Sequence, residues 1–171
     1  MIANIRIDLA NGLHIRPLNV KDATQEYADA LNDTGRVRYM TSVGSQNTCE
    51  SVARYIQENV ANSDVILFGV FEGDCLLGTS RLHDIDKECG TAWMGIFIFK
   101  DDSAKKGLGT AVIKGISSFA LDVLGLREVR AGIFEDNPAS ERAFEKAGFY
   151  VLESKTHEGR SYRIWIRKKA D

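Results

Sequence analysis

Two kinds of hydrophobic periodicity alternate along this chain, and turn-forming residues separate them. Apolar and polar residues alternate on both sides of Asn11-Gly12, a dipeptide typical of tight β-hairpins. Later runs rich in apolar and β-branched residues are bounded by polar turn residues, which is typical of strands. We therefore expect strands over about 5–9, 13–18, 65–71, 75–84, 92–99, 127–134, 149–154 and 161–166.

Spacings of three and four residues predict two helices in the first part of the chain. Segment 22–31 has this spacing, and so does a longer segment that ends near residue 61. Asn47 or Thr48 can cap the longer helix at its start. The residues between the two helices, 32–46, are polar and rich in turn formers. The expected apolar face of the longer helix consists of Val52, Tyr55, Ile56 and Val60.

Two further helices are expected in the second part. A periodic segment runs from about 110 to 123, and Gly125 suits its end. Asn137 followed by Pro138 is typical of a helix start, because asparagine caps the first amides and proline fits the first helical position. This last helix ends at Gly148. The apolar positions of the 110–123 helix are Val112, Ile116, Phe119 and Val123.

The order of these elements defines the fold class. Strands come first, then strand–helix–strand–helix, then a hairpin around 157–159. This order indicates an α/β (α+β) protein with a mixed sheet and helices on both faces. A chain of 171 residues without repeats, low-complexity tracts or an evident linker is expected to form a single domain over 1–171.

Composition excludes several classes of protein. The net charge of −2 and the lack of a basic block argue against nucleic-acid binding. No apolar run has the length of a membrane span, and polar residues interrupt the N-terminal segment, so we expect neither a membrane protein nor a signal peptide. Three widely spaced cysteines fit a reduced, cytoplasmic protein without disulfides. The histidines show no ligand spacing, and we predict no metal site.

The most informative segment, 105–111, joins the 92–99 strand to the helix after it. The first turn of a helix leaves amide N–H groups unpaired, and the helix dipole adds partial positive charge there. Gly107 and Gly109 let the backbone pass close to a bulky anion, and Lys105 and Lys106 add full charges. The segment is therefore a candidate cradle for a phosphate or pyrophosphate, although a plain glycine turn before a helix is the better explanation of a Gly-x-Gly taken alone.

Two familiar phosphate-binding motifs do not fit this segment. A P-loop requires Lys-Ser or Lys-Thr after the last glycine, whereas Gly109 is followed by Thr110-Ala111. A Rossmann motif requires a third glycine where Val112 stands. Glu128 is roughly placed for the ribose-binding acid of such a motif, but the glycines fall too late in the chain for further βα units.

A third motif combines the glycine loop with a second segment. The chain resembles the GNAT acetyltransferase superfamily, whose signature is Arg/Gln-x-x-Gly-x-Gly/Ala followed about 30 residues later by Asn-x-x-Ser/Ala and an aromatic-x-Lys-x-Gly-Phe ending. Lys106, Gly109 and Ala111 match the first part, with lysine in the Arg/Gln position. The resemblance covers about 13–166, and the order of elements agrees throughout. The second part is matched by Asn137, Ser140, Phe144, Lys146, Gly148 and Phe149.

Within the superfamily, the chain looks most like the branch of ribosomal-protein N-terminal, spermidine-type and amino-sugar acetyltransferases. Residues 36–40 look like that branch's V-x-x-Tyr-Leu segment, and Leu77-Gly78 and 94–96 look like its Ile-Gly strands. The resemblance implies a GNAT-like domain with a mixed, mostly antiparallel sheet of about seven strands, a splayed central pair and about four helices.

The resemblance also implies acetyl-CoA as the cofactor. Its pyrophosphate would lie on the amides of 106–111, and its pantetheine arm would pair with 97–99 in a gap beside 127–134. In the family this gap arises from a bulge in the central strand, and an N–H freed by a bulge can stabilise an oxyanion. The implied cofactor-binding residues are Phe97, Ile98, Phe99, Lys105, Lys106, Gly107, Leu108, Gly109, Thr110, Ala111, Asn137, Ser140, Phe144 and Lys146.

Acyl transfer to nitrogen requires that the leaving thiolate be protonated or hydrogen-bonded. Many relatives use a tyrosine for this task, but the matching position here is Phe144. Ser140 is the predicted substitute, because a serine at this point of the N-terminal acetyltransferase branch is thought to contact the cofactor sulfur. Tyr150 and Tyr162 are alternative proton donors.

The general base is harder to assign. Several relatives have an acid before the Gly-Ile of the central strand, where this chain has 92–94 without an acid. Glu135, at the end of its strand, is the first candidate, and His83 and Asp84 come next. Trp93 is a candidate wall of the acceptor pocket, or simply a core residue.

The sequence thus predicts an N-acetyltransferase that moves acetyl from acetyl-CoA to a primary amine by direct attack in a ternary complex. The acceptor is left open among a protein N-terminal α-amine, a small polyamine or aminoglycoside, and an amino-sugar nucleotide. Arg36 and Arg38 would suit an acidic acceptor. The alternatives are a non-catalytic acyl-CoA sensor of the same fold and a structural subunit, and a homodimer is left open as well.

Overall fold

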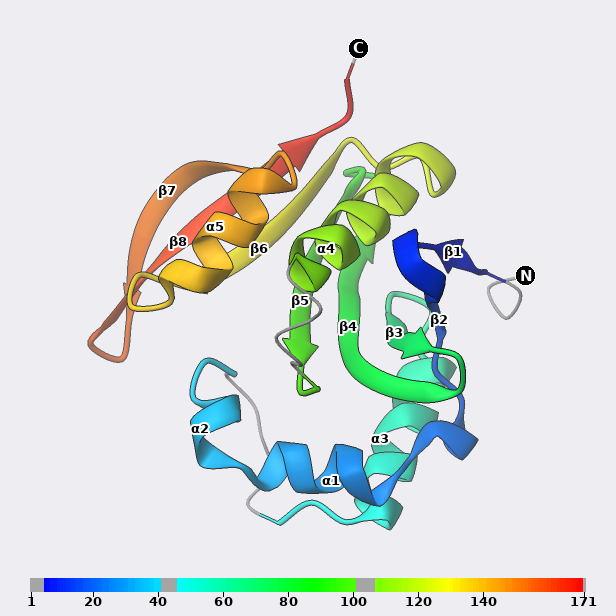
Figure 1. Ribbon diagram of the computed structural model, residues 1–171. Coiled ribbons are helices and arrows are strands. Elements are labelled where there is room, and N and C mark those ends of the chain that lie inside the picture. The colour runs from blue at the N-terminus through cyan, green and yellow to red at the C-terminus, as the bar shows by residue number, and fades with distance from the viewer. Residues whose placement is uncertain (1–4, 41–45, 101–106, 171) are drawn as a thin grey trace. The chain divides into compact units, whose positions relative to one another are not determined.

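The computed structural model describes residues 5–40, 46–100 and 107–170 (Figure 1). The described chain contains eight strands and five α-helices. The strands are β1 (Ile7–Asp8), β2 (Leu13–Pro17), β3 (Ile66–Glu72), β4 (Cys75–Asp86), β5 (Thr91–Ile98), β6 (Glu128–Phe134), β7 (Tyr150–His157) and β8 (Arg160–Lys168). The helices are α1 (Gln25–Asn32), α2 (Thr34–Val37), α3 (Cys49–Ala61), α4 (Leu108–Ser118) and α5 (Pro138–Lys146).

All eight strands belong to one sheet, in the order β1-β2-β3-β4-β5-β6-β8-β7. Strands β5 and β6 are parallel, while β1/β2, β2/β3, β6/β8 and β7/β8 are antiparallel. The chain divides into two compact units, 1–80 with 97–101 and 81–96 with 102–171. The expected α/β class and mixed, mostly antiparallel sheet are confirmed.

The first unit has its own hydrophobic core. Helices α1 and α3 begin at Thr24 and Thr48, whose side chains accept hydrogen bonds from backbone amides of the first helical turn. Their apolar faces pack with strand residues, and the ring of Tyr27 stacks on Phe99 with centroids 5.4 Å apart. The buried members of this core are Leu18, Tyr27, Ala28, Ala30, Val52, Ile56, Leu67, Phe71, Leu76, Phe97 and Phe99.

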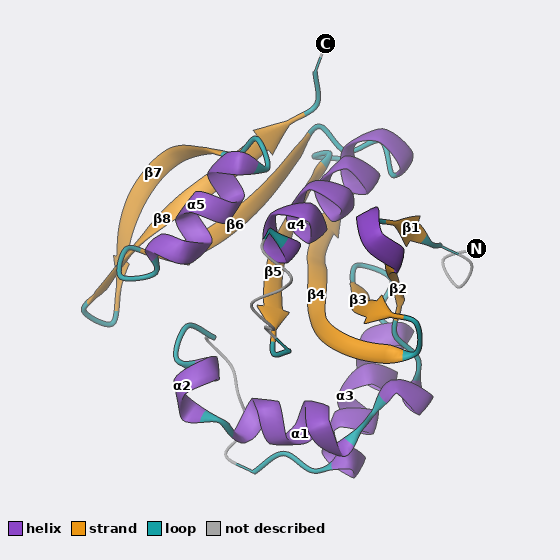
Figure 2. Ribbon diagram, in the orientation of Figure 1, coloured by secondary structure: helices purple, strands orange, loops and turns teal. Residues whose placement is uncertain are grey.

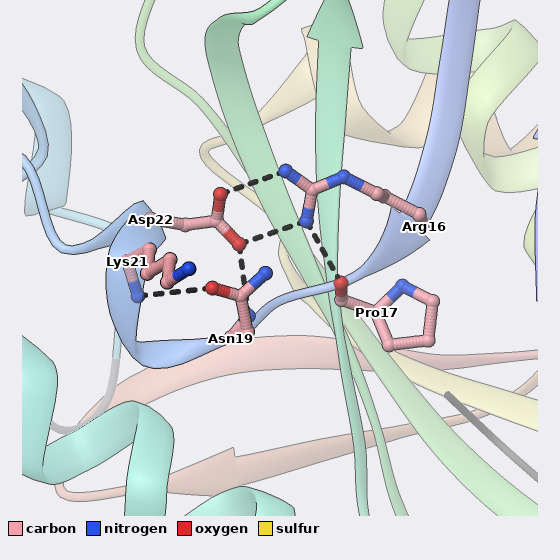
Figure 3. Close-up of polar contacts among 5 residues, drawn as sticks. All are labelled: Arg16, Pro17, Asn19, Lys21 and Asp22. Carbon is pink, nitrogen blue, oxygen red and sulfur yellow. Dashed lines mark hydrogen bonds and ion pairs between the residues drawn. The ribbon is translucent and has the colours of Figure 1, made fainter. Parts of the chain in front are cut away.

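An ion pair fixes the 3₁₀ turn between β2 and α1 (Figure 3). The two terminal nitrogens of Arg16 donate to the two carboxylate oxygens of Asp22, at 2.8 and 2.7 Å. The Asp22 carboxylate also accepts from the Asn19 backbone N–H at 2.8 Å. Burial alone would raise the pKa of Asp22, but the hydrogen bonds from Arg16 and Asn19 outweigh it and lower the pKa. The pair therefore holds the chain where it enters α1.

The second unit contains the parallel crossover β5–α4–β6, followed by α5 and the β7–β8 hairpin. Arg163 and Arg167 lie four residues apart on β8, so their side chains project from the same face of the sheet. Arg167 donates to Ser117 of α4 at 2.6 Å, and Arg163 donates to Glu141 of α5 at 2.8 Å. Both helices therefore cover one face of this unit (Figure 2).

Among the differences between the structure and the sequence-based expectation, two concern the helices. The polar segment 32–46 contains the short helix α2, which begins where the Asp33 side chain accepts from two backbone amides. The helix expected over 110–123 begins at Leu108, and its last part, Phe119–Val123, is a π-helical turn. A π turn adds a residue and rotates the end of the helix, so Val123 is 71% exposed instead of lying on the apolar face.

None of the described helices has the length and hydropathy needed to span a membrane.

Candidate active site

The parallel strands β5 and β6 pair only at their beginnings. Their register runs from Thr91 opposite Glu128 to Trp93 opposite Arg130 and ends there. Beyond this point residues 94–96 of β5 and 131–134 of β6 are not in register with each other, and β6 pairs instead with β8 on its other side. The expected splayed pair is thus present. Ligands of α/β proteins bind at such carboxyl ends of parallel strands, where neighbours diverge.

Helix α4 begins without a side-chain cap. Its N-cap residue is Gly107, with φ of 89°, a conformation that L-residues with a side chain rarely adopt. The first described helical bond runs from the Ala111 N–H to the Gly107 carbonyl, at 2.9 Å. Within the described chain, the N–H groups of residues 108–110 therefore have no acceptor, and the first turn carries no acidic residue.

Gly109 lies in the first turn of α4, and the fold gives no reason for a glycine there. Its φ is not positive, and a Cβ built on its backbone meets no described atom within 4 Å. Glycine inside a helix destabilises it by about 1 kcal/mol relative to alanine. A helix that keeps glycine next to unpaired amides is therefore suited to close approach of an anion.

Helix α5 begins differently, at Asn137. The Asn137 side-chain oxygen accepts from the Ser140 backbone N–H at 3.2 Å, and Pro138 occupies the first helical position. The cap therefore uses the backbone of Ser140 and leaves its hydroxyl unengaged by any described residue. Ser140 is partly exposed in this first turn, where the helix dipole favours a thiolate.

Two other predicted cofactor contacts lie further along α5. Phe144 is only 2% exposed, and its ring packs edge-on against Phe149 with centroids 5.0 Å apart. Phe144 is thus part of the core in this structure, and its ring anchors α5. Lys146 is exposed in the last turn, at the opposite end from Ser140. Their predicted cofactor contacts remain predictions.

Glu135, the first candidate base, comes directly after β6. Its carboxylate pairs with Nε of Arg163 at 3.3 Å, and both side chains are 38% exposed. Arg163 also pairs with Glu141 at 2.8 Å, so this arginine bridges two carboxylates. Sequence reasoning missed Arg163, although its place in an alternating strand could have indicated that it faces α5. An open hollow of about 210 Å³ adjoins Glu135 and is also lined by Asp136, Arg160 and Ser161.

The alternative donors and bases are spread over the second unit. Tyr162 lies opposite Phe134 at the end of β6, with ring centroids 6.4 Å apart. Tyr150 is 50% exposed on β7, which β8 separates from β6. His83 and Asp84 bond each other, with 3.0 Å between Nδ1 and the carboxylate. Of these four residues, Tyr162 is the one placed beside Glu135.

Phe97 and Ile98, which end β5, and Phe99, which follows it, belong to the first unit. The N–H groups of Phe99 and Lys100 both donate to the Leu77 carbonyl, at 3.1 and 3.0 Å, which is the pattern of a β-bulge. The rings of Phe97 and Phe99 are buried in the core of this unit. Any cofactor contact from 97–99 would therefore come from the backbone, as expected from the sequence.

Gly78 allows β4 to approach this bulge. A Cβ at Gly78 would lie 2.6 Å from the Phe97 carbonyl oxygen, closer than real Cβ atoms come. Arg36 of α2 donates to the Phe99 carbonyl and pairs with Asp33 at 3.0 Å. Arg36 therefore fastens α2 to the end of β5, a structural task in addition to the acceptor contact predicted for it. Lys105 and Lys106 lie outside the described residues.

A larger open hollow, of about 660 Å³, lies at the beginning of β5 and β6. Its lining includes Thr91, Arg127, Glu128 and Lys168. These positions lie at the opposite ends of β5 and β6 from the starts of α4 and α5. We therefore place the candidate active site at the helix starts, where the first amides of α4 and the Ser140 hydroxyl have no partner among the described residues.

Comparison with known proteins agrees with this geometry. The profile of the acetyltransferase (GNAT) domain matches residues 13–150. The chain therefore belongs to the GNAT acetyltransferase family and is an acyltransferase that uses acetyl-CoA as cosubstrate. Among individual relatives, it is 30% identical over 150 residues to YjcK, a probable N-acetyltransferase of Bacillus subtilis, with 81% of this chain and 80% of the relative covered.

Solved structures support the fold at lower sequence identity. A spermidine N-acetyltransferase from Vibrio cholerae, in complex with CoA and spermine, superposes with a TM-score of 0.81 at 16% identity, covering 92% of this chain and 96% of that one. The ribosomal L7/L12 α-N-protein acetyltransferase RimL, in complex with CoA, gives 0.82 at 12% identity, covering 96% and 98%. At these identities the likeness concerns the fold.

Proposed function

We propose that this protein transfers acetyl from acetyl-CoA to a primary amine by direct attack in a ternary complex, with the diphosphate of CoA on the first turn of α4. The observation that carries the proposal is Gly109. Among the described residues, it stands beside helix amides without an acceptor, at a position where a Cβ would meet no atom within 4 Å. A diphosphate needs that space, and charge-assisted bonds to backbone N–H groups would hold it.

The rest of the cofactor would run along the two diverging strands. Lys105 and Lys106 would add charge at the diphosphate, and the backbone of 97–99 would pair with the pantetheine amides. Because the Asn137 oxygen already caps α5, its side-chain NH₂ group is the part available to donate to the pantetheine arm.

Ser140 is the proposed proton donor to the leaving thiolate. Its hydroxyl is not used by the cap, and it stands in the first turn of α5, whose dipole stabilises negative charge. When acetyl-CoA is bound it supplies the thioester. The amine nitrogen forms the new bond to the acetyl carbon, the carbon–sulfur bond breaks, and the Ser140 hydroxyl donates a proton or hydrogen bond to the sulfur.

Glu135 is the proposed acceptor of the proton that the amine loses. Its exposed position beside a hollow lets a water molecule relay the proton, and Arg163 holds the carboxylate in place. Tyr162, at the same end of β6, is the alternative donor for the thiolate if Ser140 is not used.

We propose a protein N-terminal α-amine as the first acceptor to test. An α-amine has a pKa near 8, against about 10 for a simple primary amine, so it needs less help from a base. This suits a chain without an acid in 92–94, where several relatives have their base. The chain shares its fold with a ribosomal-protein acetyltransferase and with a spermidine acetyltransferase. We therefore test both peptides and polyamines as acceptors.

The test is a turnover assay that detects free thiol with acetyl-CoA and three acceptors: peptides with a free N-terminus, polyamines, and amino-sugar nucleotides. Peptides with an acetylated N-terminus and an internal lysine are the control for the α-amine. We expect the highest kcat/KM with the free peptide N-terminus. If CoA binds but no acceptor gives a rate above hydrolysis, the protein is an acyl-CoA sensor and the catalytic proposal is wrong.

A further inference from the structure

The open hollow of about 660 Å³ at the beginning of β5 and β6 has no part in the proposed reaction. All of its lining residues belong to the second unit, and they lie at the opposite end of these strands from the starts of α4 and α5. Small-molecule sites have volumes of about 300–1,000 Å³. The hollow is therefore large enough for a ligand of its own.

Positive charge is concentrated in this hollow. Four cationic side chains and a single carboxylate line it, although the whole chain carries a net charge of −2. The cations are Arg127, Arg130, Lys168 and Lys169, and the carboxylate belongs to Glu128. A concave surface on which one sign of charge dominates attracts ligands of the opposite sign. The hollow is thus electrostatically suited to an anion.

Strand register brings three of these charged residues together. Glu128 of β6 lies opposite Thr91 of β5 on one side and opposite Lys168 of β8 on the other. Arg130 is two residues further along β6, so it projects from the same face as Glu128. The Glu128 carboxylate pairs with Nε of Arg130 at 2.5 Å and with Nζ of Lys168 at 3.8 Å. One carboxylate therefore holds two cations in place and neutralises only one of their two charges.

The other two cations have no carboxylate partner in the part of the chain that the structure describes. Arg127 lies across the turn before β5, where its Nη2 donates to the Cys89 carbonyl at 2.7 Å and its Nε lies 2.8 Å from the place of a Cβ on Gly90. The Lys169 backbone N–H donates to the Arg127 carbonyl at 2.9 Å, which holds the two residues side by side. A carbonyl is neutral, so the Arg127 contact fixes the guanidinium and leaves its charge uncompensated.

Phosphate groups suit this arrangement. A guanidinium presents a planar fork of N–H donors that binds two phosphate oxygens, and a lysine binds phosphate as a point charge. A phosphate group carries about 1.5 to 2 negative charges at pH 7, against one for a carboxylate. Because the four cations come from two segments of the chain, 127–130 and 168–169, a ligand with several phosphate groups contacts more of them than a single phosphate does.

We propose that this hollow is a second ligand site, which binds a small anion with several phosphate groups at the opposite end of β5 and β6 from the candidate active site. Arg127 and Lys169 supply the main contacts, because no described carboxylate pairs with them. Arg130 and Lys168 add positive charge, and Glu128 limits the affinity by repelling the ligand. The site is independent of the proposed acetyl transfer.

The test is isothermal titration calorimetry of the full chain, saturated with CoA, with inorganic tripolyphosphate as the probe. Saturating CoA occupies the proposed diphosphate site on α4, so the heat of tripolyphosphate binding reports another site. We expect one tripolyphosphate per chain, with an affinity that falls as the salt concentration rises. Citrate, which has carboxylates in place of phosphates, should bind more weakly. Absence of binding at millimolar tripolyphosphate, or citrate binding of equal strength, overturns the proposal.

Two double variants locate the site. Arg127→Gln with Lys169→Gln removes the two cations that lack a carboxylate partner, and the affinity for tripolyphosphate should fall by about tenfold or more. Lys21→Gln with Arg54→Gln is the matched control, because it removes the same charge from exposed positions of the first unit. Its affinity should stay within about twofold of the original, since salt screens distant charges. Equal losses in both variants would mean that the overall charge binds the probe, and the proposal would be wrong.

Glu128→Gln tests the site with an effect of opposite sign. It keeps a side-chain oxygen for Arg130 and Lys168 but removes the negative charge from the hollow, so tripolyphosphate should bind about 3- to 10-fold more tightly. Misfolding cannot strengthen binding, and circular dichroism verifies the fold of every variant. An affinity that is unchanged or lower in Glu128→Gln overturns the placement of the ligand in this hollow.

Discussion

Helices α4 and α5 both start at the carboxyl end of a strand of the parallel pair, yet their first turns are built in opposite ways. Helix α5 begins at Asn137, whose side chain accepts from the Ser140 backbone N–H, and Pro138 has no N–H to satisfy. Helix α4 begins at Gly107, which has no side chain, and continues with Gly109. Helix α5 satisfies its own first turn, whereas the first amides of α4 have no partner within 5–40, 46–100 and 107–170.

The two helix starts differ in whether they favour the stability of the helix or the binding of a ligand. A capping side chain stabilises a helix by about 1 kcal/mol, and a glycine within the first turns lowers its stability by a similar amount. Helix α4 has no capping side chain, and it has a glycine in its first turn. Its stability therefore comes from the buried residues Leu108, Val112, Ile113 and Ile116 rather than from its terminus. A helix start of this kind is suited to an anionic ligand, whereas the α5 start is suited to hold a side chain in place.

The largest expected effect comes from filling the space at the start of α4. Gly109→Leu would block the approach of the diphosphate and remove at least two bonds to charged oxygens, each worth about 1.5–3 kcal/mol, so CoA affinity should fall by about 100-fold or more. Isothermal titration calorimetry with CoA measures it. The free energy of unfolding should change little, because a Cβ at this position meets no described atom within 4 Å.

Lys114→Leu is the matched control for this variant. It adds the same side chain to an exposed position further along α4, and CoA affinity should stay within a few-fold of the original. Equal loss of affinity in both variants, or none in Gly109→Leu, would show that the diphosphate does not lie on this helix start.

The next effect concerns the free hydroxyl on α5. Ser140→Ala should lower kcat by about 10- to 100-fold if the hydroxyl assists the leaving thiolate. CoA affinity and the free energy of unfolding should change little, since the cap uses the Ser140 backbone N–H. Steady-state kinetics measures the change, and Ser140→Thr, which keeps a hydroxyl, should recover part of the rate. An unchanged kcat removes Ser140 from the mechanism and favours Tyr162.

A smaller effect is expected at the cap itself. Asn137→Ala should lower the free energy of unfolding by about 1 kcal/mol, because one amide of α5 loses its acceptor. Asn137→Asp keeps the accepting oxygen but loses the NH₂ group, so it should keep the stability and weaken CoA binding. Urea denaturation and calorimetry separate the two outcomes. If the aspartate variant binds CoA normally, Asn137 is a structural cap alone.

The smallest effect is a gain in stability at α4. Gly109→Ala should raise the free energy of unfolding by about 0.5–1 kcal/mol, since alanine is the better helix former and the site has room for a methyl group. Thermal denaturation of the ligand-free protein measures it. A loss of stability would mean that Gly109 is needed by the fold, and the comparison between the two helix starts would then fail.

Much of this molecule could be predicted from local sequence patterns. Thr48 caps α3 and Asn137-Pro138 starts α5, both as the sequence indicates, and α4 starts within the glycine-rich segment, two residues earlier than expected. Each of these features depends on residues within one turn of one another, so side-chain spacing suffices to specify them. The family is predictable from the glycine-rich and Asn137 segments, and the profile of the acetyltransferase domain matches residues 13–150, which include both.

Other features could not be predicted from helical spacing or from neighbours in the sequence. The Val60 side chain is 65% exposed and Val123 71% exposed, although helical spacing placed both on apolar faces. For Val123 the cause is the π turn at Phe119–Val123, which no periodicity of 3.6 residues can express. Likewise, nothing local shows that Arg163 would bridge Glu135 and Glu141 across 28 and 22 residues of sequence.

The sequence by itself determined the order of the strands and of the four longer helices, the caps at Thr48 and Asn137 and the glycine-rich start of α4, because these are set by neighbours within a few residues. Only the tertiary structure decided where β5 and β6 separate, after Trp93 and Arg130, and which carboxylate Arg163 holds. Both depend on strand register and helix packing, which form when distant segments of the chain meet.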